Sequence, residues 1–273
     1  MESVQVFQGP EHLSFFWPGE SDAVALLVHG FPGTPAEMRH LGEALWQAGW
    51  SVQGLLLPGF GAQIASLGSY RYQDWVAAVT AALGAMKREQ HPVLLVGYSL
   101  GGALSILAAA QAPADGLALL APFWQMEGGW QGKLLPVLKY LFPYFRPFDK
   151  ADFSDPKVRE AVSYFAPDID LDDPEVQAAI RDLGIRTRTI SELQKAGRAA
   201  YRVAARLSLP TVIVQGMEDD LVKPGHTRKL AQRVRGPVEY REVQAGHDLL
   251  KPENAAWAEV RQSVLDFSAT LRG

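Results

Sequence analysis

Short runs of valine, leucine and isoleucine alternate along the chain with longer segments in which apolar residues recur at helical spacing. This alternation is typical of a mostly parallel β-sheet whose strands are joined by helical crossovers on both faces. It predicts an α/β fold with an eight-stranded, mostly parallel sheet flanked by helices. The first two strands are expected to form an antiparallel hairpin at the sheet edge. The expected strands are residues 4–7, 13–17, 25–29, 52–56, 93–98, 117–120, 211–215 and 238–243.

Helix-length segments lie between these strands and at the end of the chain. Thr34 and Glu37 frame a Thr-Pro-Ala-Glu capping box, because the threonine hydroxyl and the glutamate carboxylate can accept hydrogen bonds from free N–H groups at a helix start. Met38, Leu41 and Leu45 give the helix that follows an apolar face. Further helices are expected at residues 73–88, 100–111, 225–234 and 253–271.

The alternation stops between residues 121 and 211, an interval far longer than a crossover needs. The interval starts with aromatic and leucine-rich residues and continues as polar helical segments. We therefore expect residues 123–206 to form a helical lid inserted into a core domain made of residues 1–122 and 207–273. Its expected helix starts are Asp155-Pro156, Asp173-Pro174 and a capping box at Ser191-Glu192-Leu193-Gln194.

The strongest chemical signal is the Gly-x-Ser-x-Gly pattern centred on Ser99. It lies where an apolar strand ends and an alanine-rich helix begins. A nucleophile elbow needs this context, since the serine sits on a strained turn and the flanking glycines let strand and helix approach closely. Ser99 is the predicted nucleophile.

A serine hydroxyl needs a base to remove its proton and a carboxylate to orient that base. In this type of elbow the chain order is serine, acid, histidine. His247 follows the last expected strand, at the sheet edge where open α/β sheets place their sites, so it is the predicted base. The acid is expected after the preceding strand, where Asp219 is favoured, Asp220 is the main rival and Glu218 is a third candidate.

Hydrolysis through a serine also needs N–H donors for the oxyanion of the tetrahedral intermediate. One donor is expected from Leu100, the residue after the nucleophile. The second is expected from Phe31, in the Gly-rich loop that follows the strand at residues 25–29. His29, which starts this loop, is interpreted as a hydrogen-bonding brace.

Four motifs occur in the chain order of the α/β-hydrolase superfamily. They are His-Gly-Phe-x-Gly from His29, Gly-x-Ser-x-Gly around Ser99, Gly-x-x-Asp-x-x-Val ending at Val222, and Gly-His at His247. The run HGFPGTPAEMR from His29 to Arg39 is similar to that of bacterial carboxylesterases and monoacylglycerol lipases. The chain thus resembles these enzymes over nearly its whole length outside the expected lid.

The resemblance implies residue roles. Ser99, Asp219 and His247 would form the catalytic triad, and the N–H groups of Phe31 and Leu100 would form the oxyanion hole. The implied activity is that of a serine hydrolase that cleaves carboxylic esters through an acyl-enzyme intermediate, on short- to medium-chain acyl esters or monoacylglycerols. The alternatives are a thioesterase, an acyltransferase or a C–C bond hydrolase with the same triad, and a ligand-binding receptor with little turnover.

Composition narrows the partners and the chemistry. The chain has 273 residues, with 26 Lys and Arg against 30 Asp and Glu, and its net charge of −4 disfavours binding to nucleic acid. No cysteine is present, so disulfides and a cysteine nucleophile are excluded. No cofactor and no metal are expected, because the sequence has neither a dinucleotide fingerprint nor a phosphate loop. The first residues do not resemble a secretory signal, so a cytoplasmic location is expected.

The start of the expected lid bears on the substrate. Phe123, Trp124 and Met126 are candidates for an apolar acyl pocket, so the expected partner is a small-molecule ester. The aromatic stretch at residues 134–145 is expected to pack over that pocket, with transient contact with lipid as the alternative. No integral membrane segment is expected, because the long uncharged stretch at residues 90–114 contains the elbow and several Gly and Pro residues.

Overall fold

A seven-stranded sheet forms the centre of the computed structural model, which describes residues 7–86, 90–112, 114–125, 144–146, 148–163, 170–182 and 184–273. The strand order is β1-β3-β2-β4-β5-β8-β9. Only β1 runs antiparallel, against β3, and the other neighbours are parallel. The strands are β1 (Phe15–Trp17), β2 (Val24–Val28), β3 (Ser51–Leu55), β4 (Val93–Tyr98), β5 (Gly116–Leu120), β8 (Thr211–Gly216) and β9 (Val238–Val243).

The predicted α/β class and seven of the expected strands are confirmed, with boundaries that differ by at most two residues. Residues 4–6 of the expected first strand lie outside the described residues, and Phe7 lies in a bend. A short 3-10 helix, η1 (Pro10–His12), follows. Strand β1 pairs with β3 at the edge of the sheet, and the expected hairpin with residues 4–7 stays a prediction because residues 4–6 are not described.

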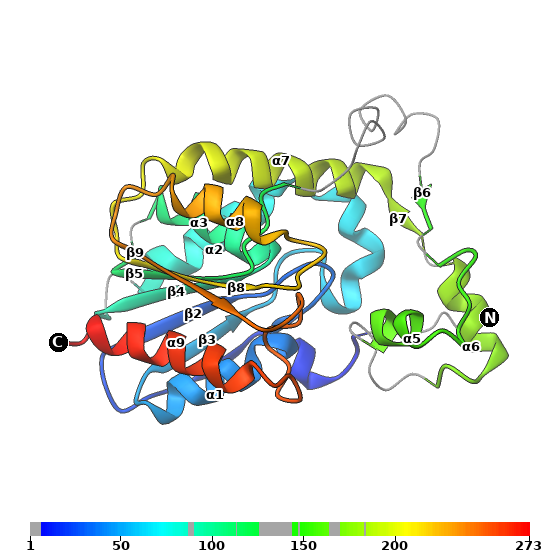
Figure 1. Ribbon diagram of the computed structural model, residues 1–273, viewed down its shortest axis with the longest axis horizontal. Coiled ribbons are helices and arrows are strands. Elements are labelled where there is room, and N and C mark those ends of the chain that lie inside the picture. Colours follow the sequence, from blue (N-terminus) through cyan, green and yellow to red (C-terminus); the bar gives the residue numbers. More distant parts are fainter. Residues whose placement is uncertain are drawn as a thin grey trace.

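Helices cover both faces of the sheet (Figure 1). Every residue of β2, β4, β5 and β8 is therefore buried, which explains why these strands read as continuous apolar runs. One face packs against α1 (Arg39–Gln47) and α9 (Trp257–Thr270), and the other packs against α2 (Tyr72–Met86), α3 (Leu100–Ala109), α7 (Thr187–Ala204) and α8 (Pro224–Ala231). Two further 3-10 helices are η2 (Pro35–Met38) and η3 (Gly61–Ser69).

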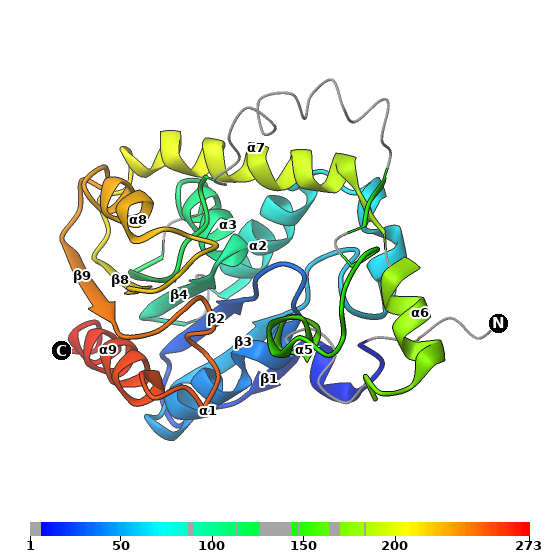
Figure 2. The same ribbon diagram turned by 45° about the vertical axis from the view of Figure 1, so that its right-hand side comes forward.

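The interval expected as a lid contains two kinds of structure. Helices α5 (Pro156–Ser163) and α6 (Pro174–Asp182) lie to one side of the sheet (Figures 1 and 2), with a small apolar cluster of their own around Phe153 and Leu171. Strands β6 (Tyr144–Phe145) and β7 (Ile185–Arg186) form a two-stranded antiparallel pair. Helix α7 then returns along the core, and its buried residues join the cluster formed by α2 and α3.

The expected helix starts in this interval have mixed outcomes. Helices α5 and α6 begin at Pro156 and Pro174, as predicted, and Asp173 caps α6 by accepting a hydrogen bond from the N–H of Glu175 at 2.8 Å. The capping box at Ser191 is wrong, because α7 already begins at Thr187, directly after β7. None of the described helices is both long and apolar enough to cross a membrane.

Candidate active site

Ser99 lies at the sharp turn that joins β4 to α3. Its backbone has φ 51° and ψ −114°, a left-handed conformation that a non-glycine residue adopts only when the surroundings enforce it. The neighbouring glycines allow this turn, since a Cβ on Gly101 would overlap the carbonyl oxygen of Val28 and one on Gly97 would overlap the backbone of Gly101. The Gly-x-Ser-x-Gly spacing thus reflects close packing of α3 against the sheet.

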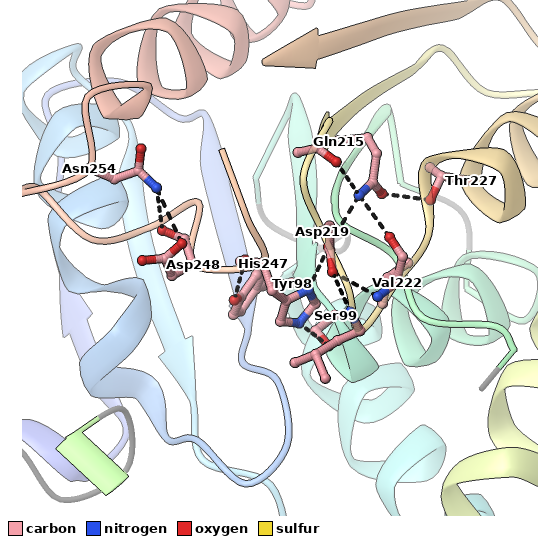
Figure 3. Close-up of polar contacts among 11 residues, drawn as sticks. Tyr98, Ser99, Gln215, Asp219, Val222, Thr227, His247, Asp248 and Asn254 are labelled. Atoms are coloured by element: carbon pink, nitrogen blue, oxygen red, sulfur yellow. Dashed lines mark hydrogen bonds and ion pairs between the residues drawn. The ribbon is translucent and has the colours of Figure 1, made fainter. Parts of the chain in front are cut away.

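The side chains of Ser99, His247 and Asp219 form one hydrogen-bonded line (Figure 3). Nε2 of His247 lies 3.0 Å from Oγ of Ser99, and Nδ1 lies 2.7 Å from Oδ2 of Asp219. The carboxylate can only accept, so Nδ1 carries the proton and Nε2 is left to accept the proton of the serine hydroxyl. This arrangement can activate a serine as a nucleophile.

The structure distinguishes the three carboxylates that compete for the acid position. Asp219 is fully buried and contacts His247. The Asp220 side chain is 90% exposed and pairs with Lys223 at 2.6 Å, and Glu218 accepts a hydrogen bond from the side-chain amide of Gln244. Of the three, only Asp219 is brought to the histidine.

The backbone that carries His247 is held by Tyr98, the residue that precedes the nucleophile. The Tyr98 hydroxyl donates to the carbonyl oxygen of His247 at 2.7 Å, and the two rings stack with centroids 5.3 Å apart. Tyr98 occupies a variable position of the elbow motif, so the motif did not predict a role for it. Tyr98 is buried, so this contact joins the serine turn and the histidine loop across the sheet edge.

The loop expected to supply an oxyanion donor lies against the nucleophile. A Cβ on Gly30 would lie 3.2 Å from Cβ of Ser99, so the backbone of this loop passes close to the nucleophile candidate. The N–H of Phe31 comes next in this loop, and the N–H of Leu100 lies in the free first turn of α3. Within the described part of the chain, neither N–H donates to a protein acceptor, so both are available to a ligand.

Glu37 braces this loop, which is not the role that its place in the capping box predicted. Its carboxylate accepts a hydrogen bond from the N–H of Gly30 at 2.5 Å. Thr34 acts as predicted, because its hydroxyl accepts from the N–H of Ala36 at 3.3 Å. The difference arises because the helix starts as the 3-10 turn η2, and the Glu37 side chain turns toward the loop between Gly30 and Gly33.

His29 is buried beneath the same loop as a neutral imidazole. Its Nδ1 lies 2.8 Å from the carbonyl oxygen of Gly30, and its Nε2 accepts from the N–H of Leu57 at 3.1 Å. Nδ1 therefore carries the proton and donates to Gly30. Burial lowers the pKa of His29 from 6.5 to about 4, against the smaller opposing effect of the Gly30 hydrogen bond. The brace interpretation agrees with this geometry.

The buried His29 predicts a loss of stability in acid. Its folded-state pKa of about 4 lies below the unfolded value of 6.5, so between these pH values the unfolded chain binds more protons. The stabilisation is full above pH 6.5 and is lost as the pH falls toward 4, with a maximum of about 3 kcal/mol. Urea unfolding at a series of pH values should show this acid loss in the wild type and a smaller one in His29→Gln. Equal acid losses in the two proteins would contradict it.

The expected pocket residues occupy different environments. The N–H of Phe123 donates to the carbonyl oxygen of Ser99 at 3.0 Å, which places Phe123 directly behind the nucleophile. Trp124 is stacked on Tyr201 of α7, with centroids 4.1 Å apart, and its indole N–H donates to the carbonyl oxygen of His226 in α8 at 2.8 Å. Met126 lies outside the described residues.

Trp124 therefore fastens the start of the inserted interval to two core helices. Helix α7 approaches it closely, since a Cβ on Gly197 would lie 2.6 Å from the Trp124 carbonyl oxygen. Arg233 makes a cation–π contact with Tyr201, its guanidinium carbon lying 4.7 Å from the centroid of the ring.

Among the described residues, no three His, Asp or Glu side chains converge in a way that could hold a metal ion.

The strand order, the strained serine turn and the Ser–His–Asp line together are those of the α/β-hydrolase fold. Residues 19–252 match the family model Hydrolase_4, which is described as serine aminopeptidase, S33. The chain belongs to this family. The α/β-hydrolase resemblance seen in the sequence is thereby confirmed.

Known proteins with similar sequences or structures include lipolytic enzymes. A thermostable monoacylglycerol lipase of Bacillus sp. (strain H-257) is 35% identical over 112 residues, which is 41% of this chain and 44% of that enzyme. A structure from a study of the metagenome-derived lipolytic enzymes LipS and LipT has a TM-score of 0.72 at 23% identity and covers 96% of this chain and 98% of its own. The monoacylglycerol lipase of Paleococcus ferrophilus has a TM-score of 0.71 at 18% identity, over 94% and 98% of the two chains.

Proposed function

We propose that the protein is a serine hydrolase that cleaves carboxylic esters. One observation carries the proposal: His247 lies between Ser99 Oγ and the buried Asp219, and the serine occupies a strained strand-to-helix turn. The family assignment supports the hydrolase class, and the partial match to a monoacylglycerol lipase supports an ester as substrate.

In the proposed first step, Ser99 Oγ attacks the ester carbonyl while Nε2 of His247 takes up the hydroxyl proton. Asp219 keeps the imidazole in the required tautomer and stabilises its protonated form. The carbonyl oxygen becomes an oxyanion, to which the N–H groups of Phe31 and Leu100 donate. Collapse of this intermediate breaks the ester C–O bond, and the imidazolium gives its proton to the departing alkoxide.

The second half of the reaction releases the acid from the serine. Water attacks the acyl-enzyme carbonyl, and His247 accepts a proton from that water. The same two N–H groups hold the second oxyanion, and Ser99 leaves with the proton returned by the imidazolium. The His247 side chain is 13% exposed, so it is in contact with solvent.

The proposed substrates are short- to medium-chain acyl esters or monoacylglycerols. Phe123 supports this choice, because its backbone is hydrogen-bonded to Ser99 and its side chain is partly buried beside the apolar cluster. We propose that the interval 123–206 forms a lid over the acyl group and that Trp124 and α7 are the part of it that packs against the core. Met126 belongs to this proposal on its sequence position alone.

A substrate panel tests the proposed activity. The purified protein is assayed for kcat/KM on p-nitrophenyl esters of increasing chain length, monoacylglycerols, acyl thioesters and an aminoacyl p-nitroanilide. We expect steady turnover with a maximum at short or medium esters and with monoacylglycerols accepted. The anilide matters because the family model is described by an aminopeptidase. A preference for the anilide or the thioester, or a single stoichiometric acylation without turnover, would reject the proposal.

A further inference from the structure

The loop that carries Asp219 is wrapped around the side chain of Gln215, a residue of β8 that lies just before the loop (Figure 3). The Gln215 side-chain amide nitrogen donates to the carbonyl oxygen of Gly216 at 3.0 Å and to that of Val222 at 2.9 Å. These two residues bracket the loop. The same nitrogen lies 3.1 Å from Oδ2 of Asp219, in the middle of the loop, so its two hydrogens are shared among these three acceptors. Gln215 is fully buried near the end of β8, so bulk solvent does not reach these contacts.

The Asp219 carboxylate has its hydrogen-bonding capacity filled. Oδ1 accepts from the N–H groups of Leu221 at 2.9 Å and Val222 at 2.7 Å. Oδ2 accepts from Gln215 and from His247 Nδ1. A carboxylate offers about four acceptor positions, so these four donors determine both the location and the rotation of the group. Of the four, Gln215 is the one side chain that shares the oxygen on which His247 depends.

Thr227 of α8 determines which end of the Gln215 amide faces the carboxylate. Its hydroxyl donates to Oε1 of Gln215 at 2.6 Å, and both side chains are fully buried. The amide oxygen is thus directed to α8 and the NH₂ group to Asp219 (Figure 3). A hydrogen-bonded line runs from Thr227 through Gln215, Asp219 and His247 to Ser99.

We propose that Gln215 and Thr227 are positioning residues for the triad acid: they act on turnover through the orientation of Asp219. This inference rests on the proposed function, because Asp219 affects turnover only if His247 is the base. Without the Gln215 donor, the carboxylate keeps its two backbone N–H partners but can rotate away from His247. The transition state then loses its oriented imidazolium, whereas binding of the ester is little affected. The signature is a lower kcat with a nearly unchanged KM.

A double-mutant cycle tests whether Gln215 acts through Asp219. Gln215→Met keeps the length of the side chain and removes the donor, and we expect kcat to fall about tenfold or more, as for a lost hydrogen bond to a charged group. In an Asp219→Asn background the same change is expected to cause no further loss, because the orientation it protects is already gone. Near-ultraviolet circular dichroism gives the folded fraction of each variant, to which kcat is referred.

Thr227 provides a second, milder test that leaves the Asp219 loop intact. We expect Thr227→Val to lower kcat several-fold and Thr227→Ser to restore most of that loss, since serine returns the hydroxyl. Thr211→Val is the matched control. Like Thr227, Thr211 is buried, but it lies at the start of β8, and its hydroxyl donates to the carbonyl oxygen of Leu209 at 3.1 Å, remote from the acid loop. This control is expected to keep the wild-type kcat.

Three results would overturn the inference. The first is that Gln215→Met lowers kcat by the same factor in the wild-type and Asp219→Asn backgrounds. The second is that it changes KM and leaves kcat unchanged. The third is an equal effect of Thr227→Val and Thr211→Val. Failure of the proposed function is a different outcome, because the wild-type protein would then lack steady ester turnover, or Ser99→Ala would keep it, whatever the Gln215 and Thr227 variants do.

Discussion

Ser99→Ala is expected to lower kcat for ester hydrolysis by about 10⁴-fold or more, to the level of catalysis that oriented N–H donors and binding alone provide. The variant is also expected to lose all covalent labelling by a fluorophosphonate probe. Its fold should persist, because the one hydrogen bond of the Ser99 side chain to another described residue is that to His247, and alanine can occupy the strained backbone as well as serine does.

A matched control is available in the helix that follows the nucleophile. Ser105 is fully buried in α3, and its hydroxyl has no hydrogen-bond partner within the described residues. We expect Ser105→Ala to retain hydrolysis and labelling. Labelling of Ser99→Ala at the wild-type rate would show that another residue is the nucleophile.

The second large effect is expected from Asp219→Asn. The amide group would retain a carbonyl oxygen for the N–H groups of Leu221 and Val222, and its NH₂ would then face His247. The histidine must respond by moving its proton from Nδ1 to Nε2, which removes the acceptor for the Ser99 proton. We expect kcat to fall about 10³- to 10⁴-fold.

Asp220→Asn is the control for this substitution, one residue further along the same loop. Its carboxylate is exposed and pairs with Lys223, so the change should alter kcat by less than about threefold. Both variants are compared on one p-nitrophenyl ester with kcat measured at saturation. If Asp220→Asn had the larger effect, the assignment of the acid would be reversed.

Local sequence was sufficient to select Ser99 and His247, which the structure brings within hydrogen-bonding distance as the candidate nucleophile and base. The glycines around Ser99 mark a strand-to-helix turn, and His247 directly follows the last strand. Both positions can therefore be found from short stretches of sequence. The acid was left open because Glu218, Asp219 and Asp220 are consecutive and chemically similar. The choice depends on which side chain turns inward, and the turn is formed around Gln215, a contact that no local pattern reveals.

Other differences have the same origin. Glu37 and Ser191 both belong to sequences with capping signals, but tertiary contacts took Glu37 to the Gly30 loop and placed Ser191 inside α7. Trp124 was expected as pocket lining because it stands at the start of the aromatic and leucine-rich interval, and that role stays a prediction. Its stacking on Tyr201 depends on α7 returning to the core about seventy residues later, which spacing does not encode.

The contacts of Trp124 with α7 and α8 bear on how residues 125–186 could change in length or sequence during evolution. The chain leaves the core at a residue held by Tyr201 and His226, and it rejoins the core along α7. Because the entropy of closing a loop grows only logarithmically with its length, the stretch between these two anchors can be lengthened, shortened or exchanged at small thermodynamic expense. If the proposed lid selects the substrate, a new specificity could arise by replacing that stretch while the residues around Ser99 stay unchanged.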